Sequence, residues 1–192
     1  MGTDLAGLVK ASNADIRGKL LTLEEADLGL SSPCDGWTVG DIVDHVTDSN
    51  VWTGDLLVTG DFETQAEDRE PALTDRASRV ASWEASVRLL DRGIAKGIDR
   101  IVRHPLGPTP AHRLLFFRSL DTLIHGWDIA RSVGADESLD QEVVSACLDI
   151  LEPIALMLCA TGMYAPPVSV SPGASAQQQL LGIVGRRSDT VA

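Results

Sequence analysis

The sequence predicts an all-α protein built as a helical bundle. Five segments place apolar residues at helical spacing, and strand-like alternation is confined to a short run at 168–170. The chain has 192 residues, of which 44% are hydrophobic, so it is long enough to bury the apolar faces of these helices in a core. We expect a single domain over residues 1–192, in which 165–192 form an extended tail with a short helix.

Capping residues and prolines set the expected limits of the helices. Thr38 followed three residues later by Asp41 is a capping-box arrangement, so the second helix is predicted to begin at Thr38. Gly134 is expected to end the fourth helix, and Pro153 to kink or break the fifth. The predicted helices span 3–20, 38–58, 73–98, 111–133 and 138–161, with a short one at 175–185.

Two internal segments are predicted to connect helices. Residues 59–72 are polar and acidic and contain Gly60 and Pro71. Residues 103–110 contain three prolines and are predicted to form a loop, because proline disrupts both helices and central strands.

Charge and composition exclude several classes of partner. A net charge of −12 disfavours nucleic acid, whose phosphates need clustered Lys and Arg, and equally disfavours anionic membrane surfaces. No apolar run reaches the roughly 18 residues that a membrane span needs. The start of the sequence lacks the basic flank and apolar run of a signal peptide. The three cysteines, Cys34, Cys147 and Cys159, are odd in number and form no close motif, so we expect reduced thiols and a cytoplasmic protein.

The pair Asp121 and His125 is the most informative feature of the fourth helix. A spacing of four residues puts both side chains on one face, one turn apart, in an otherwise apolar segment. A carboxylate in such surroundings needs a cation, a metal or strong donors. The residues leave two interpretations open: a metal site in the core of the bundle, or an Asp–His hydrogen bond that tethers two helices.

His45 is the best candidate for a third ligand. It shares a ridge of the second helix with apolar residues and so can face the bundle interior. His104 lies in the proline-rich segment, which is predicted to be a loop. His112 lies about 13 Å from Asp121 along the helix axis, at ~1.5 Å per residue, so it cannot easily join Asp121 and His125. A His, Asp, His set suits a divalent metal, zinc first and nickel second, and three protein ligands leave one position open, as in catalytic sites.

Two segments carry a family resemblance. Residues 34–46, Cys-Asp-Gly-Trp-Thr-Val-Gly-Asp-Ile-Val-Asp-His-Val, resemble the first signature of the DinB-like superfamily, and in particular of the N-terminal domain of mycothiol-dependent maleylpyruvate isomerases. Residues 121–131, Asp-Thr-Leu-Ile-His-Gly-Trp-Asp-Ile-Ala-Arg, resemble that family's second signature. The tail at 176–186 is similar to the ending of a short actinobacterial subfamily.

The resemblance implies a four-helix bundle of DinB-like type, here with an additional short C-terminal helix. It also implies a divalent metal between the helices, held at the matched positions His45, Asp121 and His125. The family often has Glu or His at the middle position, and the shorter Asp would need the helices slightly closer. The isomerase proper carries an additional C-terminal domain that helps hold its substrate, and we expect the residues after Gly162 to be too few for one.

Three further side chains are candidates for binding a thiol or a substrate. Trp37 and Trp127 are interpreted either as the lining of a ligand pocket near the metal or as core side chains. Arg118, one turn before Asp121, is expected to bind an acidic substrate group, or to pair with Asp121 if no metal is present.

Asp128 and Cys34 also lie close to the signature residues. Asp128 is three residues after His125 and would either orient its imidazole or face solvent or pair with Arg131. Cys34 has no basic flank and no adjacent histidine, and we interpret it as a small buried residue rather than a nucleophile.

The sequence therefore favours a metal-binding protein that uses a low-molecular-weight thiol, mycothiol or another, as cosubstrate against a small electrophile. Its reaction would be a thiol transfer or an isomerisation. No catalytic residue is assigned. The alternatives are a non-catalytic metal-binding regulatory or ligand-binding bundle, and a structural bundle without metal. The oligomeric state stays open between a monomer and a homodimer.

Overall fold

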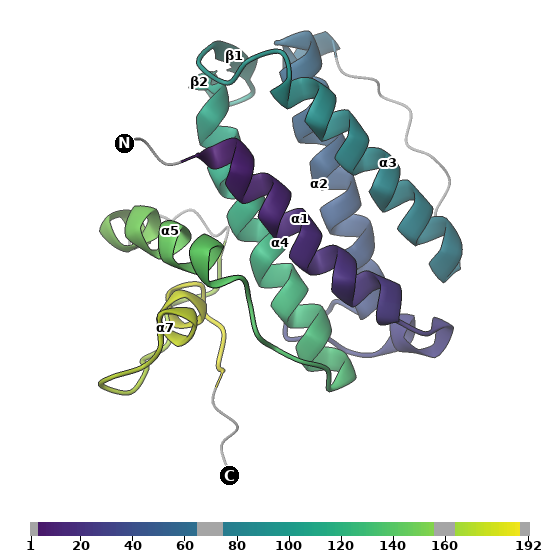
Figure 1. Cartoon of the computed structure of the whole chain (residues 1–192), viewed down its shortest axis with the longest axis vertical. Helices are drawn as coiled ribbons and strands as arrows, with labels where there is room; N and C mark the ends of the chain where they lie inside the picture. Colours follow the sequence, from purple (N-terminus) through teal and green to yellow (C-terminus); the bar gives the residue numbers. More distant parts are fainter. Residues whose placement is uncertain (1–3, 65–74, 156–163, 189–192) are drawn as a thin grey trace. The chain divides into compact units, whose positions relative to one another are not determined.

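The computed structural model describes residues 4–64, 75–155 and 164–188. Helices dominate these residues, which confirms the predicted fold class (Figure 1). None of the helices in these ranges is long and apolar enough to cross a membrane. The chain divides into two compact units, Asp4–Glu137 and Ser138–Ala192, and we describe each by itself.

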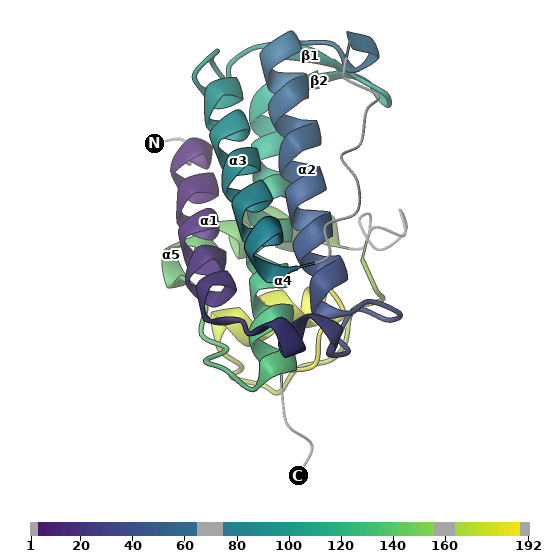
Figure 2. The same ribbon diagram turned by 90° about the vertical axis from the view of Figure 1, so that its right-hand side faces the viewer.

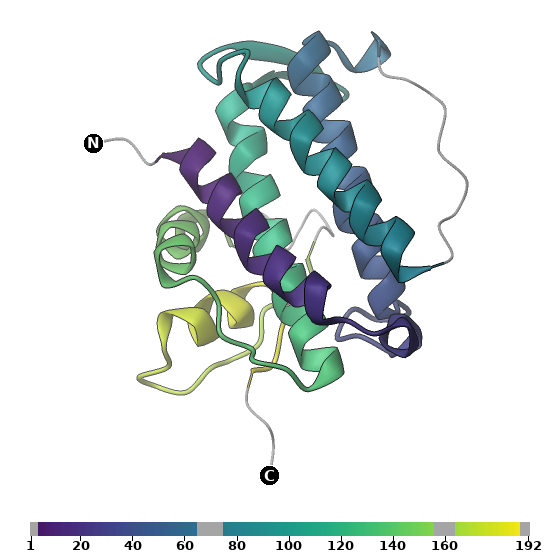
Figure 3. The same ribbon diagram turned by 45° about the vertical axis from the view of Figure 1, so that its right-hand side comes forward.

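The first unit is a bundle of four long helices: α1 (Leu5–Thr22), α2 (Val39–Thr59), α3 (Arg76–Ile94) and α4 (Ala111–Val133). Helix α1 packs on α4 and α2 packs on α3, while α2 also contacts α4. Figure 2 shows α3 beside α2, and Figure 3 shows α1 alongside α4.

Two apolar clusters of described residues, one toward each end, form part of the bundle core. Burial of these side chains is the main force that holds the helices together. The first cluster contains Ile16, Leu20, Leu23, Val39, Ile42, Val43, Val46, Trp83 and Ile129. The second contains Val9, Leu56, Leu57, Leu90, Val102, Ala111 and Leu115.

The predicted helix ends in this unit follow from local chemistry. The Asp41 backbone N–H donates to Thr38 Oγ1 at 3.2 Å, and the Thr38 backbone N–H donates to Asp41 Oδ2 at 2.8 Å. This reciprocal capping box starts α2 where the sequence predicts it. Gly134 adopts φ 66° and accommodates the left-handed turn that ends α4. Two short 3-10 turns, Glu25–Gly29 and Phe62–Thr64, complete the connections.

The expected loop at 103–110 is wrong. Strands β1 (Ile101–His104) and β2 (Gly107–Pro110) pair antiparallel between α3 and α4. Pro108 and Pro110 are two residues apart in β2, so both occupy the same class of ladder position. In an edge strand, every second residue points its N–H away from the partner strand. Proline, which has no N–H, is tolerated at those positions.

The second unit contains α5 (Gln141–Leu151), a 3-10 turn (Glu152–Ile154) and α7 (Ala176–Ile183). Pro153 lies in the 3-10 turn directly after α5, which agrees with its predicted break in the helix. The remainder of that predicted helix falls largely within 156–163, outside the described residues. Ser175 caps α7 through its hydroxyl oxygen, which accepts the Gln178 backbone N–H at 3.2 Å.

Candidate metal centre

Helix α4 places three ionisable side chains at successive turns of one face. Asp121, His125 and Asp128 follow one another at intervals of four and three residues. The Asp121 side chain is 22% exposed, His125 is 8% exposed and Asp128 is fully buried. Exposure therefore falls along the helix from Asp121 to Asp128.

Helix α2 supplies His45 to this group, as the sequence predicts. Its imidazole Nε2 lies 3.4 Å from Asp121 Oδ1 and 3.3 Å from Asp121 Oδ2. The His45 and His125 rings meet edge to face, with centroids 4.9 Å apart. The three predicted ligands thus converge at the α2–α4 interface, and their candidate ligand atoms all lie within 4.8 Å of one another.

Two separations between these atoms match the ligand spacing around a tetrahedral ion. Zinc bonds of about 2.0–2.2 Å to nitrogen and oxygen place neighbouring tetrahedral ligands roughly 3.3–3.6 Å apart. The observed separations from Asp121 Oδ1 are 3.4 Å to His45 Nε2 and 3.6 Å to His125 Nε2. The short Asp side chain therefore reaches both imidazoles without a further methylene.

Arg118 compensates the charge of Asp121. Its guanidinium forms an ion pair with Asp121 Oδ2 and lies 3.3 Å from Thr122 Oγ1, and the residue is only 6% exposed. Burial opposes ionisation of Asp121, yet the Arg118 guanidinium and the His125 and His45 imidazoles outweigh it and hold the pKa of this carboxyl far below its usual range. The candidate ligand set therefore contains an ionised carboxylate at neutral pH.

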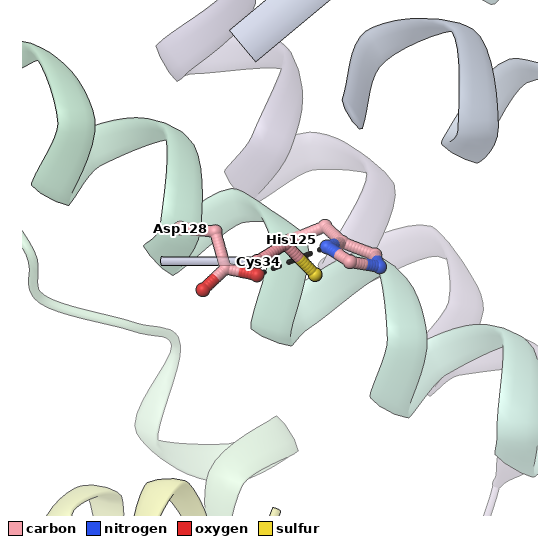
Figure 4. A group of neighbouring side chains, drawn as sticks. All are labelled: Cys34, His125 and Asp128. Atoms are coloured by element: carbon pink, nitrogen blue, oxygen red, sulfur yellow. Dashed lines mark hydrogen bonds and ion pairs between the residues drawn. The ribbon is translucent and has the colours of Figure 1, made fainter. Parts of the chain in front are cut away.

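Asp128 accepts a hydrogen bond from His125. Its Oδ2 lies 3.0 Å from Nδ1 of the imidazole, and no part of its side chain reaches solvent (Figure 4). Of the alternatives left by the sequence, a solvent-facing Asp128 is therefore wrong. A carboxylate on Nδ1 keeps the proton on that nitrogen and leaves the Nε2 lone pair for a metal.

Cys34 joins the same neighbourhood, which the sequence interpretation missed. It is half-buried, and one candidate ligand atom from each of Cys34, His125 and Asp128 lies within 4.8 Å of the others. Figure 4 shows the sulfur beside the bond between His125 and Asp128. The absence of a neighbouring histidine in sequence was uninformative, because the relevant histidine comes from α4. The sequence did offer one indication that Cys34 lies near the site, because Cys34 belongs to the first signature segment.

Among the tryptophans and the remaining histidines, some side chains contact the candidate ligands and others lie elsewhere. Trp37 is half-buried, and its ring stacks on His125 at 5.9 Å and lies 4.8 Å from His45. Trp127 is 1% exposed, and its ring lies beneath the Arg131 guanidinium at 5.5 Å, so it is a core side chain. His104 packs edge-on against Trp52, and His112 is exposed. Trp37 thus borders two of the three candidate ligands, His45 and His125.

Comparison with other proteins identifies relatives of this chain. A family model described as the mycothiol maleylpyruvate isomerase N-terminal domain matches residues 9–130, a range that contains every candidate ligand. Uncharacterized proteins from two strains of Mycobacterium tuberculosis are each 30% identical over 132 residues, which cover 67% of this chain and 68% of each relative.

Two solved structures share the fold. A crystal structure of a mutant mycothiol-dependent maleylpyruvate isomerase matches with a TM-score of 0.71 and 17% identity, over 96% of this chain and 89% of that chain. A second crystal structure of such an isomerase matches with a TM-score of 0.60 and 18% identity, over 97% and 90%. These spans contradict the expectation that a large C-terminal part of the isomerase has no counterpart here. The chain belongs to the mycothiol maleylpyruvate isomerase N-terminal domain family.

Proposed function

We propose that this protein binds a divalent metal ion through His45, Asp121 and His125 and uses the fourth coordination position for a low-molecular-weight thiol. Mycothiol is the thiol that the family name suggests. The proposed reaction joins that thiol to a small electrophile, either for transfer or for isomerisation. The observation that carries the proposal is that Asp121 Oδ1 lies 3.4 Å from His45 Nε2 and 3.6 Å from His125 Nε2, close to the edge lengths of a tetrahedral zinc site.

The side chains around the ligands fit this role. Arg118 holds Oδ2 of Asp121, which leaves Oδ1 between the two imidazoles as a monodentate ligand. Asp128 fixes the tautomer of His125. The His45 side chain is 32% exposed, so a small molecule can approach the centre from its side, next to the Trp37 ring.

Zinc or a similar ion, when bound, would stabilise the thiolate form of the thiol at neutral pH. The three ligands cannot also act as general bases, because coordination uses their lone pairs. Asp128 is committed to His125 Nδ1, so we assign no proton-transfer role to it.

One observation favours a second candidate, a non-catalytic bundle. The Arg118 guanidinium already compensates Asp121, so the cluster is electrostatically satisfied without a metal. In that case the Asp–His contacts would tether α2 to α4, and the exposed edge at His45 would serve ligand binding or regulation.

Metal analysis separates the two candidates. Protein purified without a metal-binding tag and incubated with micromolar zinc should retain about one zinc per chain. His125→Ala should lose most of it, whereas His112→Ala, a substitution of an exposed histidine, should keep it. If the wild-type protein retains no metal, or if alanine at all three ligand positions leaves the zinc content unchanged, the metal proposal is wrong.

Cobalt-substituted protein then tests thiol access. Addition of mycothiol or another small thiol should produce sulfur-to-metal charge-transfer absorption. Conjugation of a maleyl or chlorinated aromatic electrophile should require metal and thiol together. A metal-loaded protein whose spectrum does not respond to thiol would favour the non-catalytic bundle.

A further inference from the structure

A cysteine, a histidine and an aspartate gather beside the candidate metal centre, in the same four-helix unit. One candidate ligand atom from each of Cys34, His125 and Asp128 lies within 4.8 Å of the others. Figure 4 shows the Cys34 sulfur beside the hydrogen bond that joins His125 Nδ1 to Asp128 Oδ2 at 3.0 Å. The His125 side chain is 8% exposed and Asp128 is fully buried, whereas Cys34 is half-buried. The cluster therefore has a thiol at its edge and an imidazole and a carboxylate behind it.

A hydrogen-bonded turn fixes the position of Cys34. The Trp37 backbone N–H donates to the Cys34 carbonyl at 3.0 Å, and the Cys34 backbone N–H donates to Ser32 Oγ at 3.1 Å. Gly36 has a φ of 79°, which a turn with this hydrogen bond requires at its third residue. Asp35 and Gly36 are exposed. The sulfur is thus held against α4 beneath a surface turn, so an ion from solvent has a short path to it.

These three donors suit a soft metal ion. Thiolate sulfur selects soft ions, and imidazole nitrogen binds many of the same metals. As ligands, the Cys34 thiolate and the Asp128 carboxylate contribute two negative charges, which a divalent ion neutralises. The proposed zinc ligands His45 and Asp121, in contrast, offer only nitrogen and oxygen.

The distances allow the three side chains to close on one ion. Bonds of about 2.3 Å to sulfur and 2.0–2.2 Å to nitrogen and oxygen place neighbouring tetrahedral ligands roughly 3.3–3.7 Å apart. The His125 nitrogen and the Asp128 oxygen are 3.0 Å apart, close to this spacing. Because the upper limit for the separations to the sulfur is 4.8 Å, the Cys34 side chain needs to move by about 1.5 Å at most.

We propose that Cys34, His125 and Asp128 bind a soft divalent metal ion. The ion takes the place of the proton between His125 Nδ1 and Asp128 and gains the Cys34 sulfur as a third ligand. The Cys34 thiol gives up its proton to solvent when it coordinates. This site shares only His125 with the proposed zinc site and does not rest on the proposed thiol chemistry.

Cadmium is the probe, because a thiolate bound to it absorbs in the ultraviolet by sulfur-to-metal charge transfer. The decisive protein is reduced, metal-free His45→Ala, in which the proposed zinc site has lost a ligand. The two apolar clusters do not contain His45, so we expect this variant to fold, and its circular dichroism checks that it does. Titration with cadmium should give a saturable charge-transfer band.

Matched variants of cysteine identify the sulfur. Cys34→Ser in the same background should abolish the band. Cys147→Ala should keep it, because Cys147 is fully buried in the second unit and burial raises the pKa of its thiol to about 12. If His45→Ala shows no band, or if Cys34→Ser keeps it, the proposal is overturned.

Variants of aspartate test the carboxylate. Asp128→Asn replaces a charged ligand by a neutral amide and should weaken cadmium binding at least about tenfold, whereas Asp48→Asn on the exposed surface of α2 should leave it unchanged. Equal affinities of these two variants would remove Asp128 from the set and overturn the three-ligand site. Zinc retention by the wild type is measured separately, so failure here leaves the proposed function unaffected.

Discussion

At the scale of single residues, Asp128 connects the core to the candidate metal centre. Its buried carboxylate accepts the Nδ1 hydrogen bond of His125 at 3.0 Å. Asp128→Asn keeps the size but allows the amide to donate as well as accept, so His125 can adopt the wrong tautomer. We expect zinc affinity to fall about 10–100-fold, as for other residues that orient a metal-bound imidazole. Competition with a zinc chelator measures this, and Asp48→Asn on the exposed surface of α2 is the control.

Cys34 distinguishes two ways of holding a metal that share His125. The first uses His45 and Asp121, and the second uses Cys34 and Asp128. Cys34→Ser should leave zinc affinity within about threefold of the wild type if the first set is correct, whereas loss of a thiolate ligand from the second would cost far more. If Cys34→Ser loses its zinc, the metal is held by Cys34, His125 and Asp128 and not by the proposed set.

At the scale of elements, the close approach of α2 and α3 depends on glycine. A Cβ atom at Gly93 would lie 2.6 Å from Leu57 Cβ and 2.9 Å from the Gly54 carbonyl oxygen. Gly93→Ala should therefore force the helices apart and lower the free energy of unfolding by about 1–3 kcal/mol, as overpacking does. Gly18→Ala in α1, where a Cβ would meet no atom within 4 Å, should instead raise it by up to about 1 kcal/mol. Urea denaturation measures both, and equal effects would contradict the argument.

The capping box of α2 predicts a dependence of stability on pH. Hydrogen bonds from the Thr38 backbone and hydroxyl lower the pKa of Asp41, against a small opposing effect of burial. Because the folded pKa is below the unfolded one, the stabilisation is complete above the usual carboxyl range, near pH 4, and is lost as pH falls through the folded pKa. Asp41→Asn removes this titration, so the difference in urea midpoint between wild type and variant should shrink between pH 6 and pH 3. A constant difference would show that ionised Asp41 contributes nothing.

At the scale of the whole molecule, the bundle has a core that is separate from its candidate metal centre. The two apolar clusters contain none of the three ligands, so we expect the chain to stay helical without metal. Zinc at about 100 times its Kd should add about 2.7 kcal/mol to the free energy of unfolding by mass action. Scanning calorimetry with zinc and with a chelator should show a higher Tm with zinc and the same far-ultraviolet circular dichroism at 20 °C. Loss of helicity on chelation would instead indicate a structural metal.

Features that depend on local spacing could be predicted from the amino-acid sequence. Helical periodicity, the Thr38 cap and Gly134 gave the limits of α2 and α4, because these signals lie within a few residues of the ends they set. The common face of Asp121 and His125 follows in the same way. The β1–β2 hairpin escaped prediction, because three prolines argue against a strand unless the pairing register is known.

Which helix faces meet depends on the packing of the whole bundle. The periodicity of α2 allows His45 to point inward, but its approach to Asp121 depends on how α2 packs on α4. Cys34 and Trp37 lie close to His125, although about ninety positions of sequence separate them from it. Packing of side chains from distant segments fixes these contacts, because helix periodicity sets which residues share a face and close packing of the whole core selects the partner of that face.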